Sequence, residues 1–335
     1  MRDLKFGVFD HLDRGQRSVT ELYDQRLQIV EHYDRAGFYA YHLAEHHATP
    51  LGMAPSPSVF LSAVAQRTKN LRFGPLVYLL PFYHPIRLAE EIAMLDHLSH
   101  GRLEVGIGRG QSPIELSLYG QDVGTAPAVF QETLQVMELA FTAERVSFAG
   151  KHFTFDGFPV ELRPLQQPHP PYWYGVGSPE SAADYGQRGF HAVTLAKPAP
   201  AAAIVSRFYE GSAAGGWSGR RMGICRFIVV GETDDEAKSV AARAYPAWHA
   251  SFFALFRRYN RTPVMTTWAP TFAEMEANGL ACAGSPGTVA AALDAQLSET
   301  GANYLVGQLV FGDMSLADAM KSIALFADQV MPKLV

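Results

Sequence analysis

The stretch LRFGPLVYLLPFYHPIRLAEEIAMLDHLSHGRLEVGIGRG, residues 71–110, contains a complete strand–helix–strand unit. Residues 71–80 and 103–107 are short apolar runs, typical of buried strands. Between them, Pro85–Leu98 has its apolar residues at helical spacing, with proline in the first turn and Gly101 just after the end. Strands joined through a helix pair in parallel, because the chain must cross back over the sheet before the second strand begins.

The same alternation extends along the whole chain. Strands are expected at 5–9, 38–44, 71–80, 103–107, 172–176, 192–195, 222–230 and 304–310. Eight strand–helix units in 335 residues favour an α/β fold built as one (β/α)₈ TIM barrel. A doubly wound open sheet is the second possibility. It would carry Gly-x-Gly-x-x-Gly after its first strand, where this chain has Phe9-Asp10-His11-Leu12.

Two segments are expected to depart from the regular barrel. The sequence of residues 145–160 predicts a β-hairpin inserted between barrel elements as an excursion, with its turn at Ala149-Gly150-Lys151. Residues 257–282 are rich in threonine, proline and aromatic residues and are expected to be irregular. A segment of this length and composition is a candidate lid over the site. We expect residues 1–335 to form a single domain that includes both segments.

Composition excludes several classes of protein. The chain is 48% hydrophobic and 18% charged, which indicates a sizeable core rather than disorder. Its 28 Lys and Arg against 33 Asp and Glu give a net charge of −5, which argues against nucleic acid as the main partner. Two cysteines cannot form a disulfide framework or a four-thiolate metal site. The N-terminal residues lack the apolar core of a signal peptide and no stretch of 18 apolar residues occurs, so a cytoplasmic location is expected.

In a barrel the reacting groups lie at the C-terminal ends of the strands. Glu45-His46-His47 follows the second predicted strand, and one of its histidines is expected to act there as a general base or hydrogen-bond donor. A purely structural histidine is the alternative. A metal site is not favoured, because adjacent residues on a strand point to opposite faces.

Two further strand ends carry groups suited to an anion. Arg109 stands between glycines after the fourth strand, where its guanidinium could form a bidentate hydrogen bond with a phosphate. Gly177, Ser178 and Ser181 surround a predicted helix start after the fifth strand, where free N–H groups attract anions. A solvated arginine and an ordinary serine cap are the alternatives. Whether both features meet at one phosphate depends on the curvature of the barrel.

Aromatic residues gather in two places. Residues 79–85, LLPFYHP, form an apolar lip after the third strand, where His84 is expected to serve loop packing rather than catalysis. The region 248–268 contains two tryptophans, three phenylalanines and a tyrosine. It could line a hydrophobic substrate pocket or pack against a partner subunit.

The chain resembles the bacterial luciferase family of flavin-dependent monooxygenases along its whole length. The resemblance lies in the order and spacing of Glu45-His46-His47, the LLPFYHP of 79–85, the LSHGRLEVGIGRG of 98–110 and the MPKL of 331–334. It implies a (β/α)₈ barrel that binds reduced FMN supplied by a separate reductase. It also implies that O₂ adds to the flavin to give a flavin peroxide, which oxidises a small hydrophobic substrate such as an aldehyde.

The resemblance also assigns roles to individual residues. His46 falls at the catalytic position, and Arg109 falls at the arginine that binds the flavin phosphate. A cis peptide between residues 76 and 77, under the flavin, is a feature that the family can carry. Gly108 stands where luciferase has a reactive cysteine, so the chemistry of that thiol is not carried over. The full set of cofactor-binding residues implied is Glu45, Leu76, Val77, Arg109, Val176, Gly177, Ser178 and Ser181.

Two other functions are possible on the same scaffold. A deazaflavin-dependent oxidoreductase would transfer hydride and would need basic residues at the mouth for the acidic cofactor tail. The net charge disfavours it, although Arg257, Arg258 and Arg261 could serve. A non-catalytic flavin-storing or partner subunit would have lost its histidine and phosphate groups, which are intact here.

The resemblance further implies a homodimer. In dimers of this family the early helices pack across the interface, so residues 56–67 and Pro85–Leu98 are the candidates. Both carry apolar stripes, which helices that pack against a barrel need equally.

Overall fold

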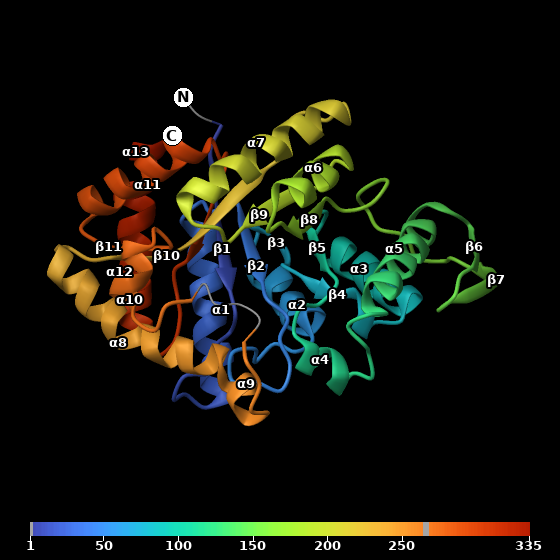
Figure 1. Cartoon of the computed structure of the whole chain (residues 1–335), viewed down its shortest axis with the longest axis horizontal. Coiled ribbons are helices and arrows are strands. Elements are labelled where there is room, and N and C mark those ends of the chain that lie inside the picture. The colour runs from blue at the N-terminus through green and yellow to red at the C-terminus, as the bar shows by residue number, and fades with distance from the viewer. Residues whose placement is uncertain (1–2, 264–267) are drawn as a thin grey trace.

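The computed structural model describes residues 3–263 and 268–335, and its centre is a parallel barrel (Figure 1). The main sheet has the order β3-β2-β1-β12-β10-β9-β8-β5-β4, with β11 (Ala281–Gly284) paired to β10. β3 and β4 are two parts of the strand predicted at 71–80. Because β3 pairs with β2 and β4 pairs with β5, the ring closes through this interrupted strand. The predicted (β/α)₈ barrel is therefore confirmed. The strands of the ring are β1 (Lys5–Asp10), β2 (Ala40–Leu43), β3 (Arg72–Pro75), β4 (Tyr78–Leu79), β5 (Val105–Gly108), β8 (Tyr172–Gly175), β9 (His191–Thr194), β10 (Met222–Val230) and β12 (Tyr304–Gln308).

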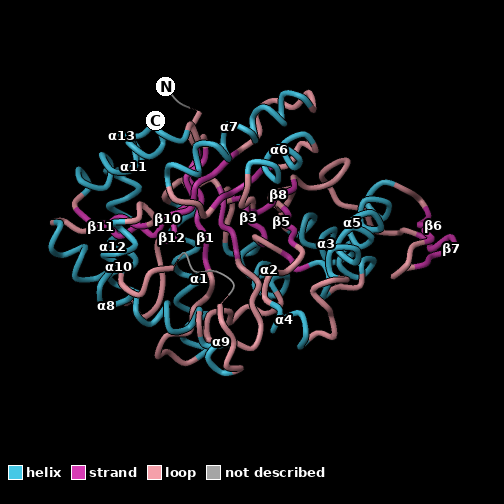
Figure 2. The backbone as a smooth tube through the Cα atoms, in the orientation of Figure 1, coloured by secondary structure: helices cyan, strands magenta, loops and turns pink. Residues whose placement is uncertain are grey.

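Helices surround the strands on the outside (Figure 2). Most of them begin at a serine or threonine whose side chain accepts from the first turn, as Ser178 does for α6 and Ser285 for α11. The helices of the described residues are α1 (Val19–Arg35), α2 (Pro57–Arg67), α3 (Pro85–Leu98), α4 (Pro113–Leu118), α5 (Ala126–Thr142), α6 (Pro179–Gln187), α7 (Pro198–Ala214), α8 (Asp234–Phe252), α9 (Ala254–Arg258), α10 (Phe272–Ala277), α11 (Pro286–Thr300), α12 (Leu316–Leu325) and α13 (Met331–Leu334), with short turns η1 (Leu80–Phe82) and η2 (Phe326–Val330). Within the described ranges, no helix combines the length and the apolar character needed to cross a membrane.

The excursion is an antiparallel hairpin of β6 (Arg145–Ala149) and β7 (Thr154–Pro159) that extends away from the barrel (Figure 1). Glu132 on α5 holds its turn, because its carboxylate accepts from the N–H groups of Lys151, His152 and Phe153 at 2.8–3.1 Å. The hairpin is therefore tied to the helix that precedes it.

The expectation that residues 257–282 are irregular is wrong for part of that segment. A capping box of Thr271 and Glu274 starts α10. The chain then forms β11 (Ala281–Gly284), which pairs in parallel with the second half of β10, as Phe227↔Ala281. Four residues in a strand carry little period-two signal, and β11 forms because the long strand β10 offers it an edge. Residues 264–267 of the candidate lid lie outside the described residues.

A layer of polar side chains lies inside the barrel near the N-terminal ends of its strands. The carboxylate of Glu104 is 1% exposed and accepts from Tyr39 Oη at 2.7 Å, Arg72 Nε at 2.5 Å and Trp173 Nε1 at 2.5 Å. Burial would raise the pKa of Glu104, but the charge of Arg72 and the neighbouring donors outweigh it and hold that pKa below its ordinary value. The buried carboxylate of Glu104 therefore has hydrogen-bond donors at both of its oxygens, which makes this layer a rigid floor for the barrel interior.

Stability is expected to fall as the pH drops from about 6.5 towards 4. Burial lowers the pKa of both His42 and His191 to about 4. Between these values the unfolded chain binds protons that the folded chain does not, so acid favours unfolding. Urea unfolding at pH 7, 5.5 and 4.5 measures the effect, and His191→Asn, which keeps an acceptor for Arg221 N, should show a shallower dependence. A free energy of unfolding that does not change over this range would contradict the prediction.

Candidate active site

A cavity of about 680 Å³ opens at the C-terminal ends of the barrel strands. Side chains that follow several different strands enter it: His46 follows β2, Arg109 follows β5 and Ser178 follows β8. Of the nine residues predicted for the site, eight line this cavity: Glu45, His46, Leu76, Val77, Arg109, Gly177, Ser178 and Ser181.

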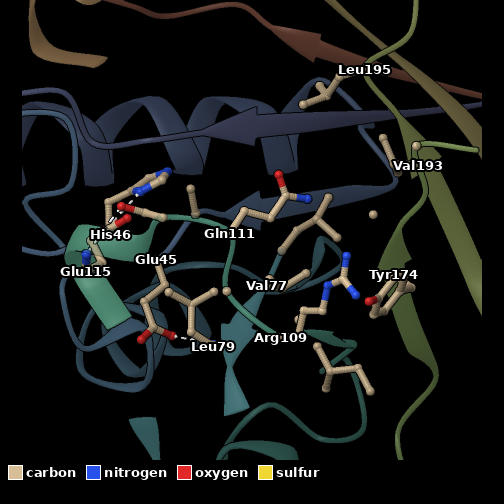
Figure 3. Close-up of a pocket in the computed structure, with 18 of the residues that line it drawn as sticks. Glu45, His46, Val77, Leu79, Arg109, Gln111, Glu115, Tyr174, Val193 and Leu195 are labelled. Atoms are coloured by element: carbon tan, nitrogen blue, oxygen red, sulfur yellow. Dashed lines mark hydrogen bonds and ion pairs between the residues drawn. The ribbon is translucent and has the colours of Figure 1, made fainter. Parts of the chain in front are cut away.

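His46 stands at one end of the cavity beside an acid (Figure 3). Its Nδ1 lies 3.3 Å from Oε1 of Glu115, which is 5% exposed. Burial alone would lower the pKa of His46, but the charge and hydrogen bond of Glu115, with the charge of Glu45, raise it above its ordinary value. Glu115 shows the reverse: burial would raise its pKa, and His46 holds it below the ordinary value. This arrangement favours a cationic His46, able to donate through Nε2.

Glu45 and His47 form part of the wall rather than a free acid–base pair. His47 Nε2 lies 2.8 Å from Glu45 Oε1, and His47 Nδ1 lies 2.6 Å from Tyr119 Oη. Glu45 Oε2 accepts from Leu79 N at 3.1 Å and from Tyr83 Oη at 2.9 Å. Burial raises the pKa of Glu45 against the opposing effect of these donors. Both carboxylate oxygens of Glu45 are therefore occupied by the protein.

Arg109 stands at the other end of the cavity, towards Tyr174 (Figure 3). Its side chain is exposed and makes no hydrogen bond or ion pair with any residue of 3–263 or 268–335. Strands β5 and β8 are neighbours, paired as Gly106↔Trp173, so the segments that follow them meet. The curvature of the barrel thus brings Arg109 and the start of α6 to the same cavity.

The glycines around Arg109 serve the packing of strands. A Cβ at Gly106 would lie 2.3 Å from Pro75 O, and one at Gly108 would lie 2.4 Å from a methyl group of Val77. β5 can therefore approach β3 and β4 only with glycine at these positions. The peptide bond between Leu76 and Val77, at the same place, is cis. Gly177 differs, because nothing lies within 4 Å of a Cβ built there.

The start of α6 is partly satisfied within the chain. The Ser178 hydroxyl accepts from Ser181 N at 3.2 Å, as the capping alternative expects. Val176 does not line the cavity: its side chain is 3% exposed in the core, and its N–H donates to Val193 O at 2.9 Å. Its amide is therefore committed to the sheet, and its side chain faces the core.

The walls between the two ends are largely apolar. In the aromatic region 248–268, Phe252, Phe256 and Trp268 line the cavity, so part of this region builds the pocket wall. Leu76 and Val77 lie on another wall, with Ile107 beside them. Within the described ranges, no group of three or more His, Cys, Asp or Glu side chains is placed to hold a metal ion.

The sequence did not reveal several polar residues of the cavity, among them His11, Glu115, Tyr174 and Cys225. Glu115 carries a local signal, since Ser112 three residues earlier caps α4 by accepting from Glu115 N at 3.3 Å. Its contact with His46 joins residues far apart in the sequence and has no such signal. Burial raises the pKa of the Cys225 thiol to about 12, which argues against a thiolate there.

Known sequences resemble this chain over different shares of its length. The model of the luciferase-like monooxygenase family matches residues 4–304. The chain is 40% identical over 333 residues to an uncharacterized protein of Sinorhizobium fredii, y4wF, covering 98% of this chain and 97% of that one. It is 33% identical over 182 residues to the oxygenase component of the flavin-dependent trigonelline monooxygenase of Acinetobacter baylyi, covering 53% of this chain and 50% of that one.

Solved structures share the fold. The monooxygenase RslO1 from Streptomyces bottropensis superposes with a TM-score of 0.90 at 24% identity, over 99% of this chain and 100% of that one. The oxygenating constituent of 3,6-diketocamphane monooxygenase from Pseudomonas putida, solved with FMN, gives 0.83 at 23%, over 99% of each chain. An F420-dependent secondary alcohol dehydrogenase gives 0.75 at 19%, over the whole of both chains. With the family model matched over nearly the full length, the chain belongs to the luciferase-like monooxygenase family of flavin-dependent oxidoreductases.

Proposed function

We propose that the protein is an FMN-dependent monooxygenase that uses reduced FMN and O₂ to oxidise a small hydrophobic organic substrate. The proposal rests on one observation: the two ends of a single cavity offer different polar groups. Arg109 and the start of α6 offer an anion site at one end, and His46 with Glu115 offers a proton donor at the other. Apolar walls join the two ends.

The residues present fit FMN. Arg109 has a free guanidinium, and a Cβ at Gly175 or Gly177 would meet nothing within 4 Å, which leaves room for a phosphate beside α6. Arg109, Gly177 and Ser178 would hold that phosphate, and Leu76 and Val77 would contact the ring system. Reduced FMN supplies the electrons that activate O₂. The aromatic wall would exclude water, and His46 would hold a proton towards the substrate.

A deazaflavin in place of FMN is the second candidate, and charge argues against it. Arg109 is the one Arg or Lys among the described residues of the cavity lining, which also includes the exposed Asp184. Arg257, Arg258 and Arg261 do not line the cavity, and Arg257 donates to Ala250 O while Arg258 donates to Ala48 O. An acidic cofactor tail would find little positive charge here.

A separate flavin reductase is proposed as the transient partner that supplies reduced FMN. The trigonelline relative is the oxygenase component of its system, which supports this division of labour. The experiment that tests the whole proposal is anaerobic titration with reduced FMN, followed by mixing with oxygenated buffer under rapid-scan absorbance. Slow, multiphasic reoxidation supports oxygen activation in the cavity. Tight binding of a deazaflavin, with no retention of reduced FMN, would refute the proposal.

Arg109→Ala is expected to weaken reduced-FMN binding by about 1–3 kcal/mol, roughly 5- to 150-fold in Kd, because it removes a charge-assisted contact with the phosphate. Anaerobic fluorescence titration measures the change. Arg207→Ala is the matched control, since Arg207 is an exposed residue of α7 paired with Glu210. An unchanged Kd for Arg109→Ala would remove this residue from the phosphate site.

We also propose a homodimer that packs through α2 and α3. These neighbouring helices expose Val59 (72%), Met94 (54%) and Leu98 (45%), an apolar group that a second copy would cover. Sedimentation velocity at micromolar concentration should show a species of twice the 36.7 kDa chain mass. Met94→Asp should shift it towards monomer, whereas Val123→Asp, at another exposed apolar residue, should not. A wild-type monomer at this concentration would contradict the proposal.

A further inference from the structure

A second histidine lies beside His46 in the same cavity. His11 follows β1 as His46 follows β2, and the two strands pair in parallel as Asp10↔Leu43. The ring centroids of His11 and His46 are 5.7 Å apart, with 23° between the ring planes. His11 lines the cavity and keeps 8% of its surface exposed. Two imidazoles thus face one small volume.

The turn that carries His11 is held firmly. Asp10 accepts from Leu12 N at 2.9 Å and from Tyr41 Oη at 2.7 Å, and it pairs with the buried Arg26 at 3.1 Å. The turn is also bonded to the segment that follows His46, because Met53 N donates to Leu12 O at 3.2 Å. The relative placement of the two rings is therefore a property of the fold.

The two imidazoles differ in charge. Burial, followed by the charges of His46 and Arg26, lowers the pKa of His11 well below its ordinary value, against a smaller opposing effect of Gln308. Glu115 and Glu45 raise the pKa of His46 despite burial. These opposite shifts favour a cationic His46 beside a neutral His11. A neutral imidazole has one donor nitrogen and one acceptor nitrogen.

Gln308, at the end of β12, lies close to His11. Gln308 Nε2 lies 3.7 Å from Cys225 Sγ, which orients the amide and leaves its oxygen for another partner. Gln308 Oε1 is buried and has no well-aligned partner among the described residues. The contact of Gln308 with His11 favours a protonated ring, as contact with an acceptor oxygen does. We take Gln308 Oε1 as the acceptor that a ring N–H of His11 faces, which leaves the other nitrogen of the neutral imidazole as an acceptor for a ligand.

The other close neighbours of His11 are a threonine hydroxyl and two aromatic rings. Thr49 also lines the cavity, but its hydroxyl donates to Ser251 O at 2.9 Å and accepts from Leu51 N at 3.3 Å. The rings of Phe9 and Trp248 contact His11 edge-on at 4.7 and 5.8 Å. The indole N–H of Trp248 is buried and has no hydrogen-bond partner among the described residues, and the charges of His46 and Arg26 also act on His11. In so dry a place an unmet hydrogen bond discriminates between ligands.

We propose that His11 is the hydrogen-bond acceptor for the organic substrate, beside the donor His46, so that the site selects a hydrophobic molecule bearing a hydroxyl group over a ketone of the same shape. This inference rests on the proposed function and names its substrate class. His11 is then a specificity-determining residue of the same cavity. It touches the substrate, whereas Gln308 acts through it as a positioning residue.

Calorimetric titration with 2-octanol and with 2-octanone tests this directly, because the two probes share a carbon skeleton and only the alcohol can donate. The protein is titrated under argon, with and without saturating reduced FMN. We expect 2-octanol to bind more tightly, and His11→Phe to reduce the alcohol-to-ketone ratio of affinities by about 3- to 10-fold. Comparing ratios between proteins cancels the difference in hydration of the probes.

Two further variants separate recognition from folding. His11→Asn keeps a neutral acceptor and should keep part of the alcohol preference even if His11→Phe is unstable. Phe256→Leu alters the apolar wall and should change both affinities while leaving their ratio intact. Thermal unfolding of each variant identifies any that does not fold.

The outcomes also separate this inference from the proposed function. An alcohol-to-ketone ratio that is equal in wild type and His11→Phe, with His11→Phe folded, overturns it. The inference is also overturned if His11→Asn, when folded, loses as much of the alcohol preference as His11→Phe does. Reduced FMN that fails to bind, alongside a ratio that follows His11, refutes the flavin function and leaves the recognition by His11 standing.

Discussion

Replacing His46 with alanine should slow substrate oxidation by about 10²- to 10⁴-fold, the range expected when a positioned general acid–base group is removed. His46 is placed for this role by its contact with Glu115 at 3.3 Å and by an Nε2 without a partner in the described chain. Its side chain lies at the opposite end of the cavity from Arg109 (Figure 3). Reduced-FMN affinity should therefore change little.

Steady-state oxygen consumption, corrected for hydrogen peroxide release, measures the loss, and anaerobic titration measures FMN affinity. His84→Ala is the matched control, since His84 is exposed outside the cavity and its ring contacts Phe153 and Phe155. Loss of FMN binding in His46→Ala would instead make His46 a binding or structural residue.

Glu115→Gln adds a pH test of the same assignment. Because Glu115 raises the pKa of His46, a protonated His46 persists to higher pH in the wild type and is lost as the pH rises through that raised pKa. The basic limb of the rate profile should therefore move to lower pH in Glu115→Gln. A limb that stays in place would show that His46 does not act in its protonated form.

Glu104→Gln should lower the free energy of unfolding by about 3 kcal/mol. Its carboxylate accepts three hydrogen bonds in the barrel interior, from Tyr39, Arg72 and Trp173. The amide has one acceptor oxygen and places an NH₂ group among these donors, and Arg72 loses its charge partner. Arg72 keeps 24% of its side chain exposed, so solvent offsets part of the loss.

Urea unfolding at pH 7 measures this effect. Glu144→Gln, an exposed acid-to-amide change outside the barrel, should stay within about 0.5 kcal/mol of wild type. A loss below about 1 kcal/mol for Glu104→Gln would mean that the hydrogen-bond network of Glu104 relaxes around the amide and is not rigid.

The barrel could be predicted from the sequence because its signals are local. The helix Pro85–Leu98 begins at a proline and ends near a glycine, and apolar runs such as 222–230 mark strands. β11 escaped prediction because it depends on the exposed edge of β10 and carries little pattern of its own. A strand of four residues is defined by its partner more than by its composition.

The site divides in the same way. Glu45-His46-His47, Arg109 and Ser178 were recognisable because each is a reactive or anion-binding group directly after a strand, and the barrel places all strand ends at one opening. Val176 was expected at the cofactor, but its side chain lies in the core. The end of a strand does not reveal in the sequence which side its residues face. Gly108 looked suited to a ligand, yet its missing side chain makes room for Val77 on a neighbouring strand.

The sequence by itself determined the elements, their parallel order and the residue types offered at the barrel mouth, since these follow from periodicity, caps and spacing along the chain. Tertiary structure alone decided that Glu115 meets His46, that His11 stacks on His46 and that Gln308 lies close to His11. The physical reason is that protonation and hydrogen-bond roles depend on burial and on charges a few ångströms away. Those neighbours come from β1, α4 and β12, which only the closed barrel brings together.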